Sequence, residues 1–163
     1  MIKGLLVLLG TVVLLRCADA AEARKSVAQI SFTVERPIQT FPALDAKRLF
    51  ALGMIETGND DSEVGAAGEV SRYQIHPDVW KAYSETANYR DTEAATVVAR
   101  RHWAWLAGRF QDKTGRLPSD LDMYVMWNTG LGYYSRKGFL PAQLAGSVRE
   151  RAQRFVNLVN RKG

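Results

Sequence analysis

Apolar residues at helical spacing, in segments divided by glycine and proline, are the feature of this sequence that most restricts its fold. The first segment opens at Pro42, carries apolar residues three and four positions apart, and ends before Gly58. Further helical segments are indicated over residues 77–84, 91–111 and 121–127, the last of these capped by Ser119 or Asp120, and after Pro141. We therefore predict a mainly α-helical domain over residues 42–163.

The first twenty residues have the pattern of an export signal. Lys3 gives a positive start, residues 4–15 form an apolar run, and Ala18-Asp19-Ala20 supplies the small residues of a cleavage site. The run is too short to span a bilayer comfortably, which favours a cleaved signal over a retained membrane anchor. We predict a signal peptide over residues 1–20, cleaved before Ala21 or within a few residues of it. The protein is then periplasmic or secreted and meets the membrane only through this segment.

Cleavage at this point leaves a mature chain without cysteine. Cys17 is the only cysteine, and Arg16 stands where lipid attachment requires a small residue, so we expect a protein without a lipid anchor. The mature chain keeps 20 basic and 16 acidic residues, a net charge of +4. This modest excess suits an anionic cell-wall polymer. Nucleic acid would suit it equally, but an exported protein rarely meets nucleic acid, and we expect no such partner.

Residues 21–41 are predicted to form an N-terminal arm ahead of the helical domain. They include a β-compatible run from Ile30 to Val34, followed by Pro37. This pattern indicates an extended segment or a short strand near the N-terminus.

Two segments of the helical part carry a resemblance to a known family. One is Glu56-Thr57-Gly58-Asn59, continued by Gly65-Ala66-Ala67-Gly68-Glu69-Val70-Ser71-Arg72-Tyr73-Gln74-Ile75; the other is Trp127-Asn128-Thr129-Gly130-Leu131-Gly132. They resemble the signatures of soluble lytic transglycosylases, in which a helix ends in Glu-Ser-Gly, a Gly-rich loop leads to a Gln, and Ala-Tyr-Asn-Ala-Gly follows. No gap is needed from Glu56 to Gln74. The resemblance covers about residues 43 to 135.

The resemblance implies a lysozyme-like fold, as in goose-type lysozymes, and a peptidoglycan-cleaving activity. One Glu of the family donates a proton to the β-1,4 glycosidic oxygen between N-acetylmuramic acid and N-acetylglucosamine. The same Glu then takes a proton from the muramic C6 hydroxyl, which gives a 1,6-anhydro end. The family's reaction implies no metal and no other cofactor. We therefore expect a cell-wall lyase whose partner is the peptidoglycan glycan strand, and which acts as a monomer.

Carried over residue by residue, the resemblance names the candidate site. Glu56 matches the catalytic acid/base, Gln74 matches a Gln that contacts substrate sugars, and Asn128 matches a motif residue beside the groove. Tyr73 and His76 fall near positions that line the groove. Trp127 stands where the family has a Tyr close to the catalytic Glu, so a hydroxyl partner is lost. Three loop positions also depart from the family: Gly65 replaces a substrate-contacting Ser, Ser71 replaces a Gly, and Glu69 replaces a small apolar residue.

The chemistry proposed for Glu56 agrees with its predicted position at a helix end. A carboxyl that donates a proton near neutral pH needs a raised pKa. The negative end of the helix dipole and apolar neighbours such as Ile55 and Trp127 both disfavour its charged form.

Glu69, a second carboxylate in the Gly-rich loop, leaves the reaction outcome open. An inverting hydrolase needs a base about 6.5–9.5 Å from the acid to activate water. Glu69 is a candidate for that base, so a hydrolytic muramidase or a chitinase-like enzyme on the same fold is an alternative. The equal alternative is a structural role for Glu69, in which it pairs with Arg72 or with a loop amide. A non-catalytic cell-wall-binding protein is the alternative from another class, and an intact Glu56 argues against it.

The remaining aromatic and basic residues have simpler interpretations. We expect Trp80, Trp103 and Trp105 in the core, and His102 on a solvated face. The arginines of the last helical segment are expected to face water: Arg149, Arg151, Arg154 and Arg161. Two histidines without ligand spacing predict no metal site.

Overall fold

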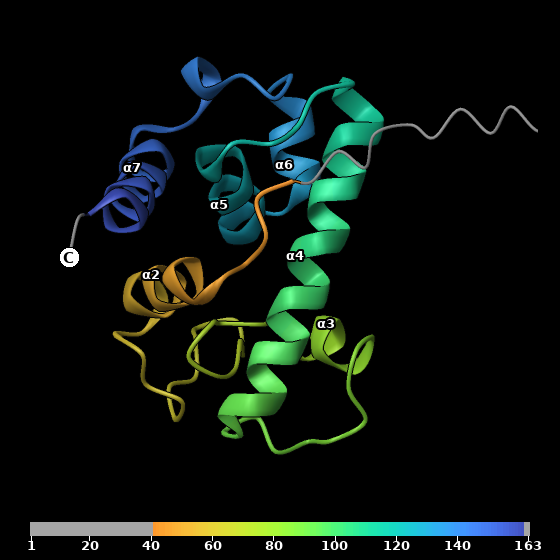
Figure 1. Ribbon diagram of the computed structural model, residues 1–163, viewed down its shortest axis with the longest axis vertical. Coiled ribbons are helices and arrows are strands. Elements are labelled where there is room, and N and C mark those ends of the chain that lie inside the picture. Colours follow the sequence, from red (N-terminus) through yellow and green to blue (C-terminus); the bar gives the residue numbers. More distant parts are fainter. Residues whose placement is uncertain (1–40, 162–163) are drawn as a thin grey trace, which may run out of the picture. The chain divides into compact units, whose positions relative to one another are not determined.

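The computed structural model describes residues 41–161, and this part of the chain is mainly α-helical, as predicted (Figure 1). Its elements are α2 (Ala46–Glu56), α3 (Pro77–Lys81), α4 (Thr92–Thr114), α5 (Asp120–Thr129), α6 (Leu131–Arg136), the short 3₁₀ helix η1 (Pro141–Gln143) and α7 (Gly146–Asn160). Between residues 41 and 161, β pairing is limited to one isolated antiparallel bridge, from Val70 to Ile75.

Several sequence predictions fall outside the described residues. These are the signal peptide over 1–20, Cys17, the β-compatible run from 30 to 34 and the arm over 21–41, except for its last residue. Among the helices of residues 41–161, none has the length and apolar character that crossing a bilayer requires.

The helix boundaries follow capping residues more closely than apolar spacing. The first helix begins at Ala46 instead of Pro42, because the Asp45 carboxylate accepts a hydrogen bond from the Arg48 amide (2.9 Å) and caps the first turn. α4 extends three residues past the predicted end and stops where Gly115 takes a left-handed conformation with φ of 70°. α3 ends at Lys81, three residues earlier than predicted.

The buried helix α5 holds the domain together. It contacts α4, α6 and α7, and α2 in turn contacts α7. The side chains of residues 123–126 on α5 are at most 1% exposed. The Tyr124 ring stacks on Phe155 of α7, with ring centroids 5.1 Å apart. This packing fixes the position of α5, and therefore also the position of the residues at its C-terminal end.

A buried carboxylate anchors the N-terminal end of α5. The Asp122 side chain is 3% exposed. It accepts hydrogen bonds from Arg116 Nη1 (2.7 Å) and Nη2 (3.0 Å) and from the Tyr134 hydroxyl (2.6 Å). It also accepts from the Ser119 amide (2.9 Å), while the Asp122 amide donates to the Ser119 hydroxyl, which completes a capping box. One side chain thus connects the cap of α5, the preceding loop and α6.

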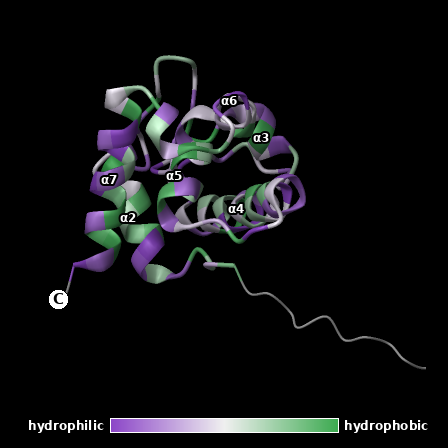
Figure 2. Ribbon diagram, turned by 90° about the horizontal axis from the view of Figure 1, so that it is seen from above, coloured by the Kyte–Doolittle hydropathy of each residue, from purple (hydrophilic) through white to green (hydrophobic). Residues whose placement is uncertain are grey.

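The last helix, α7, packs against α2 and is strongly two-sided. Seen from above and coloured by hydropathy, α2 and α7 lie side by side, and each carries both hydrophobic and hydrophilic residues (Figure 2). Ala152, Phe155 and Val159 form the buried stripe of α7. This contact joins the first described helix to the last and brings the arginines of α7 near the end of α2.

Candidate active site

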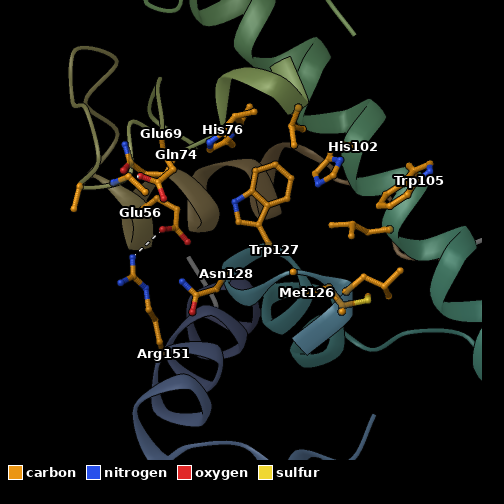
Figure 3. Close-up of a pocket in the computed structure, with 18 residues that line it drawn as sticks. Glu56, Glu69, Gln74, His76, His102, Trp105, Met126, Trp127, Asn128 and Arg151 are labelled. Carbon is orange, nitrogen blue, oxygen red and sulfur yellow. Dashed lines mark hydrogen bonds and ion pairs between the residues drawn. The ribbon is translucent and has the colours of Figure 1, made fainter. Parts of the chain in front are cut away.

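A pocket of about 810 Å³ lies where the ends of α2 and α5 meet the Gly-rich loop, α4 and α7. Glu56, Glu69, Gln74 and Arg151 line one end of it, and His102 and Trp105 line the other, with Trp127 between them (Figure 3). Segments from along the whole described part of the chain therefore contribute to a single concave surface, which is where a ligand site is expected.

Glu56 is the last residue of α2, and its side chain is 6% exposed. The Tyr124 hydroxyl donates a hydrogen bond to Oε1 (2.7 Å), and Arg151 Nη2 donates to Oε2 (2.8 Å). Arg151 also donates from Nε to the Tyr124 oxygen (2.7 Å) and from Nη2 to the carbonyl of Ile55 (3.2 Å). Each carboxylate oxygen of Glu56 therefore has a protein donor, and the three side chains form a closed ring of hydrogen bonds.

The environment of Glu56 acts on its pKa in opposite directions. Burial raises the pKa, because it penalises the charged form, while the hydrogen bond from Tyr124 and the positive charge of Arg151 lower it. The negative charge of Glu69 adds a smaller upward effect, and the net result is a raised pKa. Burial and the neighbouring carboxylate also raise the pKa of the Tyr124 hydroxyl, which therefore stays protonated and remains a donor. The direction found for Glu56 is the one that a proton donor needs.

The Gly-rich loop places Gln74 and Glu69 over the end of α2. The Thr57 hydroxyl donates to the carbonyl of Arg72 (3.0 Å), and Gln74 takes a positive φ of 51°. A Cβ added at Gly65 would lie 2.3 Å from the Gln74 amide oxygen and 2.4 Å from a Glu69 carboxylate oxygen. Gly65 is therefore required by the way these two side chains lie against the loop backbone.

Glu69 is held by the loop and not by an arginine. Its Oε2 accepts a hydrogen bond from the Ala67 amide (3.0 Å). Arg72, the other expected partner, instead forms a two-point ion pair with Asp61, whose Oδ2 also accepts from Thr92 (2.8 Å). Of the two expected structural roles, pairing with a loop amide is confirmed and pairing with Arg72 is wrong. Glu69 nevertheless lines the same pocket as Glu56.

The other expected groove residues divide into two groups. Gln74, His76, Trp127 and Asn128 line the pocket. Tyr73 does not line it: its side chain is 4% exposed, and its hydroxyl lies 3.3 Å from Thr96 Oγ1. The backbone carbonyl of Tyr73 accepts a hydrogen bond from Trp127 Nε1 (3.0 Å), so this residue supports the pocket wall from behind. His76 caps α3 through its Nδ1, which accepts from the Asp78 amide (3.3 Å).

Two residues of α4 were expected elsewhere and line the pocket instead. Trp105 was expected in the core but is 48% exposed, and His102 was expected on a solvated face but packs among three aromatic rings. Burial lowers the pKa of His102 to about 4, so the ring is neutral at pH 7. Trp80 and Trp103 lie in the core as expected, each 1% exposed.

Tyr124 and Arg151 are the contacts of Glu56 that sequence reasoning missed. Tyr124 precedes Trp127 by three positions on α5, so its ring lies on an adjacent face one turn earlier in the helix. Arg151 was expected to face water with its neighbours, yet it follows Val148 by three positions and precedes Phe155 by four. That spacing places Arg151 at the edge of the buried stripe of α7. It is the sequence signal from which a partly buried Arg151 could have been predicted.

Among residues 41–161, no three or more His, Cys, Asp or Glu side chains gather in an arrangement that would hold a metal ion. Comparisons of the chain with protein-family models, with curated proteins and with solved structures found no match. A functional assignment therefore depends on the chemistry of the site and on the motifs that carry it.

Replacing Arg151 by Gln is expected to raise the pKa of Glu56 further. The change removes the positive charge that favours the carboxylate and leaves burial unopposed on that side. Titration of the Glu56 side-chain carboxyl by carbon-13 NMR measures this directly. Arg154→Gln, on the same helix but lining a different surface pocket, is the control and should leave the titration unchanged. An unchanged pKa of Glu56 in Arg151→Gln would contradict the described contact.

Proposed function

We propose that this protein is an exported peptidoglycan lytic transglycosylase with a lysozyme-like domain over residues 42–163. The observation that carries the proposal is the environment of Glu56: a carboxyl with a raised pKa, at a helix end, in the wall of a pocket. The motif residues Gln74 and Asn128 line the same pocket although they are far from each other in sequence. Their convergence on Glu56 is what a shared site requires.

In the proposed reaction, protonated Glu56 donates its proton to the glycosidic oxygen between N-acetylmuramic acid and N-acetylglucosamine. The C1–O bond breaks, and the N-acetylglucosamine end leaves with the new hydroxyl. The Glu56 carboxylate then takes the proton of the muramic C6 hydroxyl, whose oxygen bonds to C1 and closes the 1,6-anhydro ring. Glu56 ends the cycle protonated, and no water is consumed.

Tyr124 and Arg151 support this cycle by stabilising the intermediate carboxylate. Between the two proton transfers Glu56 is negatively charged, and hydrogen bonds from a hydroxyl and a guanidinium to a buried carboxylate are the stronger kind. The family has a Tyr near the catalytic Glu at the position of Trp127, and Trp127 has no hydroxyl to offer. Tyr124 supplies the hydroxyl instead. In this chain the hydroxyl comes from one turn earlier on the same helix.

The proposal extends to location and partner. The predicted signal peptide over residues 1–20 would deliver the protein to the periplasm or the exterior, where peptidoglycan lies. The net charge of +4 predicted for the mature chain would favour approach to an anionic wall. We propose a monomer that acts on glycan strands without a metal or another cofactor.

Mass spectrometry of digested peptidoglycan tests the proposed reaction. Purified sacculi incubated with the protein should release fragments that end in 1,6-anhydro-N-acetylmuramic acid. Release of fragments with reducing ends, and none with anhydro ends, would refute the transglycosylase and favour a hydrolase.

A hydrolytic muramidase or chitinase-like enzyme is the second candidate, favoured by the position of Glu69. This carboxylate lines the same pocket as Glu56 and accepts from the Ala67 amide, so it is available to activate a water molecule.

Replacing Glu69 by Gln separates the two candidates. A transglycosylase should keep most of its activity, because Glu56 performs both proton transfers. A hydrolase that uses Glu69 as base should lose about 10²-fold or more. The rate of fragment release from sacculi, followed by chromatography, is the measurement. Glu63→Gln is the matched control, because Glu63 is an exposed loop residue outside this pocket.

A further inference from the structure

The pocket continues past Trp127, away from Glu56, to aromatic side chains on α4 (Figure 3). The rings of Trp105 and His102 lie nearly parallel, at 14°, with centroids 5.6 Å apart. His102 meets the Trp127 ring at a steep angle, with centroids 5.5 Å apart. Trp105 thus stands at the exposed end of a row of three aromatic rings in contact, Trp127, His102 and Trp105, and this row begins beside the proposed site of bond cleavage.

Core packing does not explain why a tryptophan stands at position 105. Trp103, two residues earlier on α4, already fills the core and is 1% exposed, while Trp105 keeps 48% of its surface exposed. His102 and Trp105 are three positions apart, so both project from one face of the helix. A large aromatic side chain left half exposed in a concave surface is a common feature of ligand-binding sites.

The two ends of the pocket differ in charge. Glu56, Glu69 and Arg151 line one end. No other Asp, Glu, Lys or Arg among the described residues lines the pocket, and Leu106, Met126 and Leu131 add apolar surface to it. His102 is neutral, and its buried Nδ1 has no hydrogen-bond partner within residues 41–161, so ring stacking holds it in place. The aromatic end therefore suits an uncharged part of a ligand.

We propose that Trp105, positioned by His102, forms a distal sugar-binding subsite that holds an uncharged N-acetylhexosamine of the glycan strand. The apolar C–H face of the pyranose ring stacks on the indole, while another part of the same strand lies at Glu56. This inference rests on the proposed function for the identity of the strand. Sugar units of the strand that carry charged peptide stems are better accommodated at the end of the pocket near Arg151 and Glu69.

Calorimetric titration with the uncharged hexasaccharide of N-acetylglucosamine tests the subsite. The full chain carrying Glu56→Gln serves as the parent, so that the ligand is not consumed. Adding Trp105→Ala should lower the affinity for the hexasaccharide about tenfold. Trp105→Phe keeps an aromatic face and should recover most of the affinity. Phe50→Ala is the control, because Phe50 is 60% exposed on α2, outside the pocket.

Two results would overturn the subsite: equal hexasaccharide affinity in the parent and in Trp105→Ala, or no binding of the hexasaccharide by the parent. Product analysis keeps this outcome separate from the proposed function. A protein that releases anhydro ends equally well with and without Trp105 keeps the function and loses the subsite. A protein that releases no fragments but binds the hexasaccharide through Trp105 keeps the subsite and loses the function.

Discussion

Replacing Glu56 by Gln is expected to reduce glycan cleavage about 10³-fold while leaving the fold and wall binding intact. Gln has the shape of Glu but neither donates nor accepts a proton in the reaction, so both proposed proton transfers are lost. The fold should tolerate the change, because Tyr124 can still donate to the Gln side-chain oxygen. The Arg151 side chain, 35% exposed, can turn toward water when it loses its ion pair. Loss of turbidity of purified cell walls, together with soluble fragment release, measures the effect.

The control for this experiment is Glu63→Gln, which removes an exposed carboxylate outside the pocket and should leave the rate unchanged. Wall binding, measured by co-sedimentation, should be equal for the wild-type protein and Glu56→Gln. If the two proteins bind walls equally and are equally inert, the enzyme proposal fails and the non-catalytic wall-binding alternative is favoured.

Replacing Asp122 by Ala is expected to lower the free energy of unfolding by about 3 kcal/mol. The change removes the capping box of α5, worth about 1 kcal/mol, and leaves the fully buried Tyr134 hydroxyl without its acceptor. Urea unfolding at pH 7, followed by circular dichroism, is the measurement. Asp112→Ala is the matched control: its ion pair with Arg109 is exposed and 3.5 Å long, and its loss should cost less than about 0.5 kcal/mol.

The Asp122 network also gives stability a dependence on pH. Burial alone would raise the pKa of Asp122, but hydrogen bonds from Arg116, Tyr134 and Ser119 outweigh burial and lower it. The unfolded chain therefore binds a proton at Asp122 more readily than the folded one. The stabilisation of the folded state by ionised Asp122 is complete above about pH 4. It is lost as the pH falls through the lowered pKa that Asp122 has in the folded state. The stability difference between the wild-type protein and Asp122→Ala should shrink on acidification, and a constant difference down to about pH 2 would contradict this account.

Local sequence signals were sufficient to predict the helical class and the position of Glu56. The apolar spacing before Gly58 indicated a helix that ends at or near Glu56, and Glu56 is the last residue of α2. The start of the same helix was placed four residues too early, because Pro42 is a general start signal while the Asp45 cap depends on one specific hydrogen bond.

The partners of Glu56 could not be predicted in the same way, because they depend on how α5 and α7 pack. Apolar spacing identifies a buried face, but it does not say which distant residue a polar side chain at the edge of that face will meet. Arg151 is 95 positions from Glu56, and Tyr124 is 68 positions away. His102 and Trp105 were misplaced for a related reason: a tryptophan on a helix is usually core, and only the packed structure distinguishes Trp103 from Trp105.

The contact between α2 and α7 has a consequence for when the site comes into existence. The ribosome makes α2 before α7, so a nascent chain carries Glu56 before it carries Arg151 or the Phe155 that packs on Tyr124. An unfinished or unfolded precursor therefore lacks the complete ring of hydrogen bonds around its carboxyl. For a protein proposed to cleave peptidoglycan, full assembly of the site is thus delayed until α7 has been made and has packed against α2 and α5.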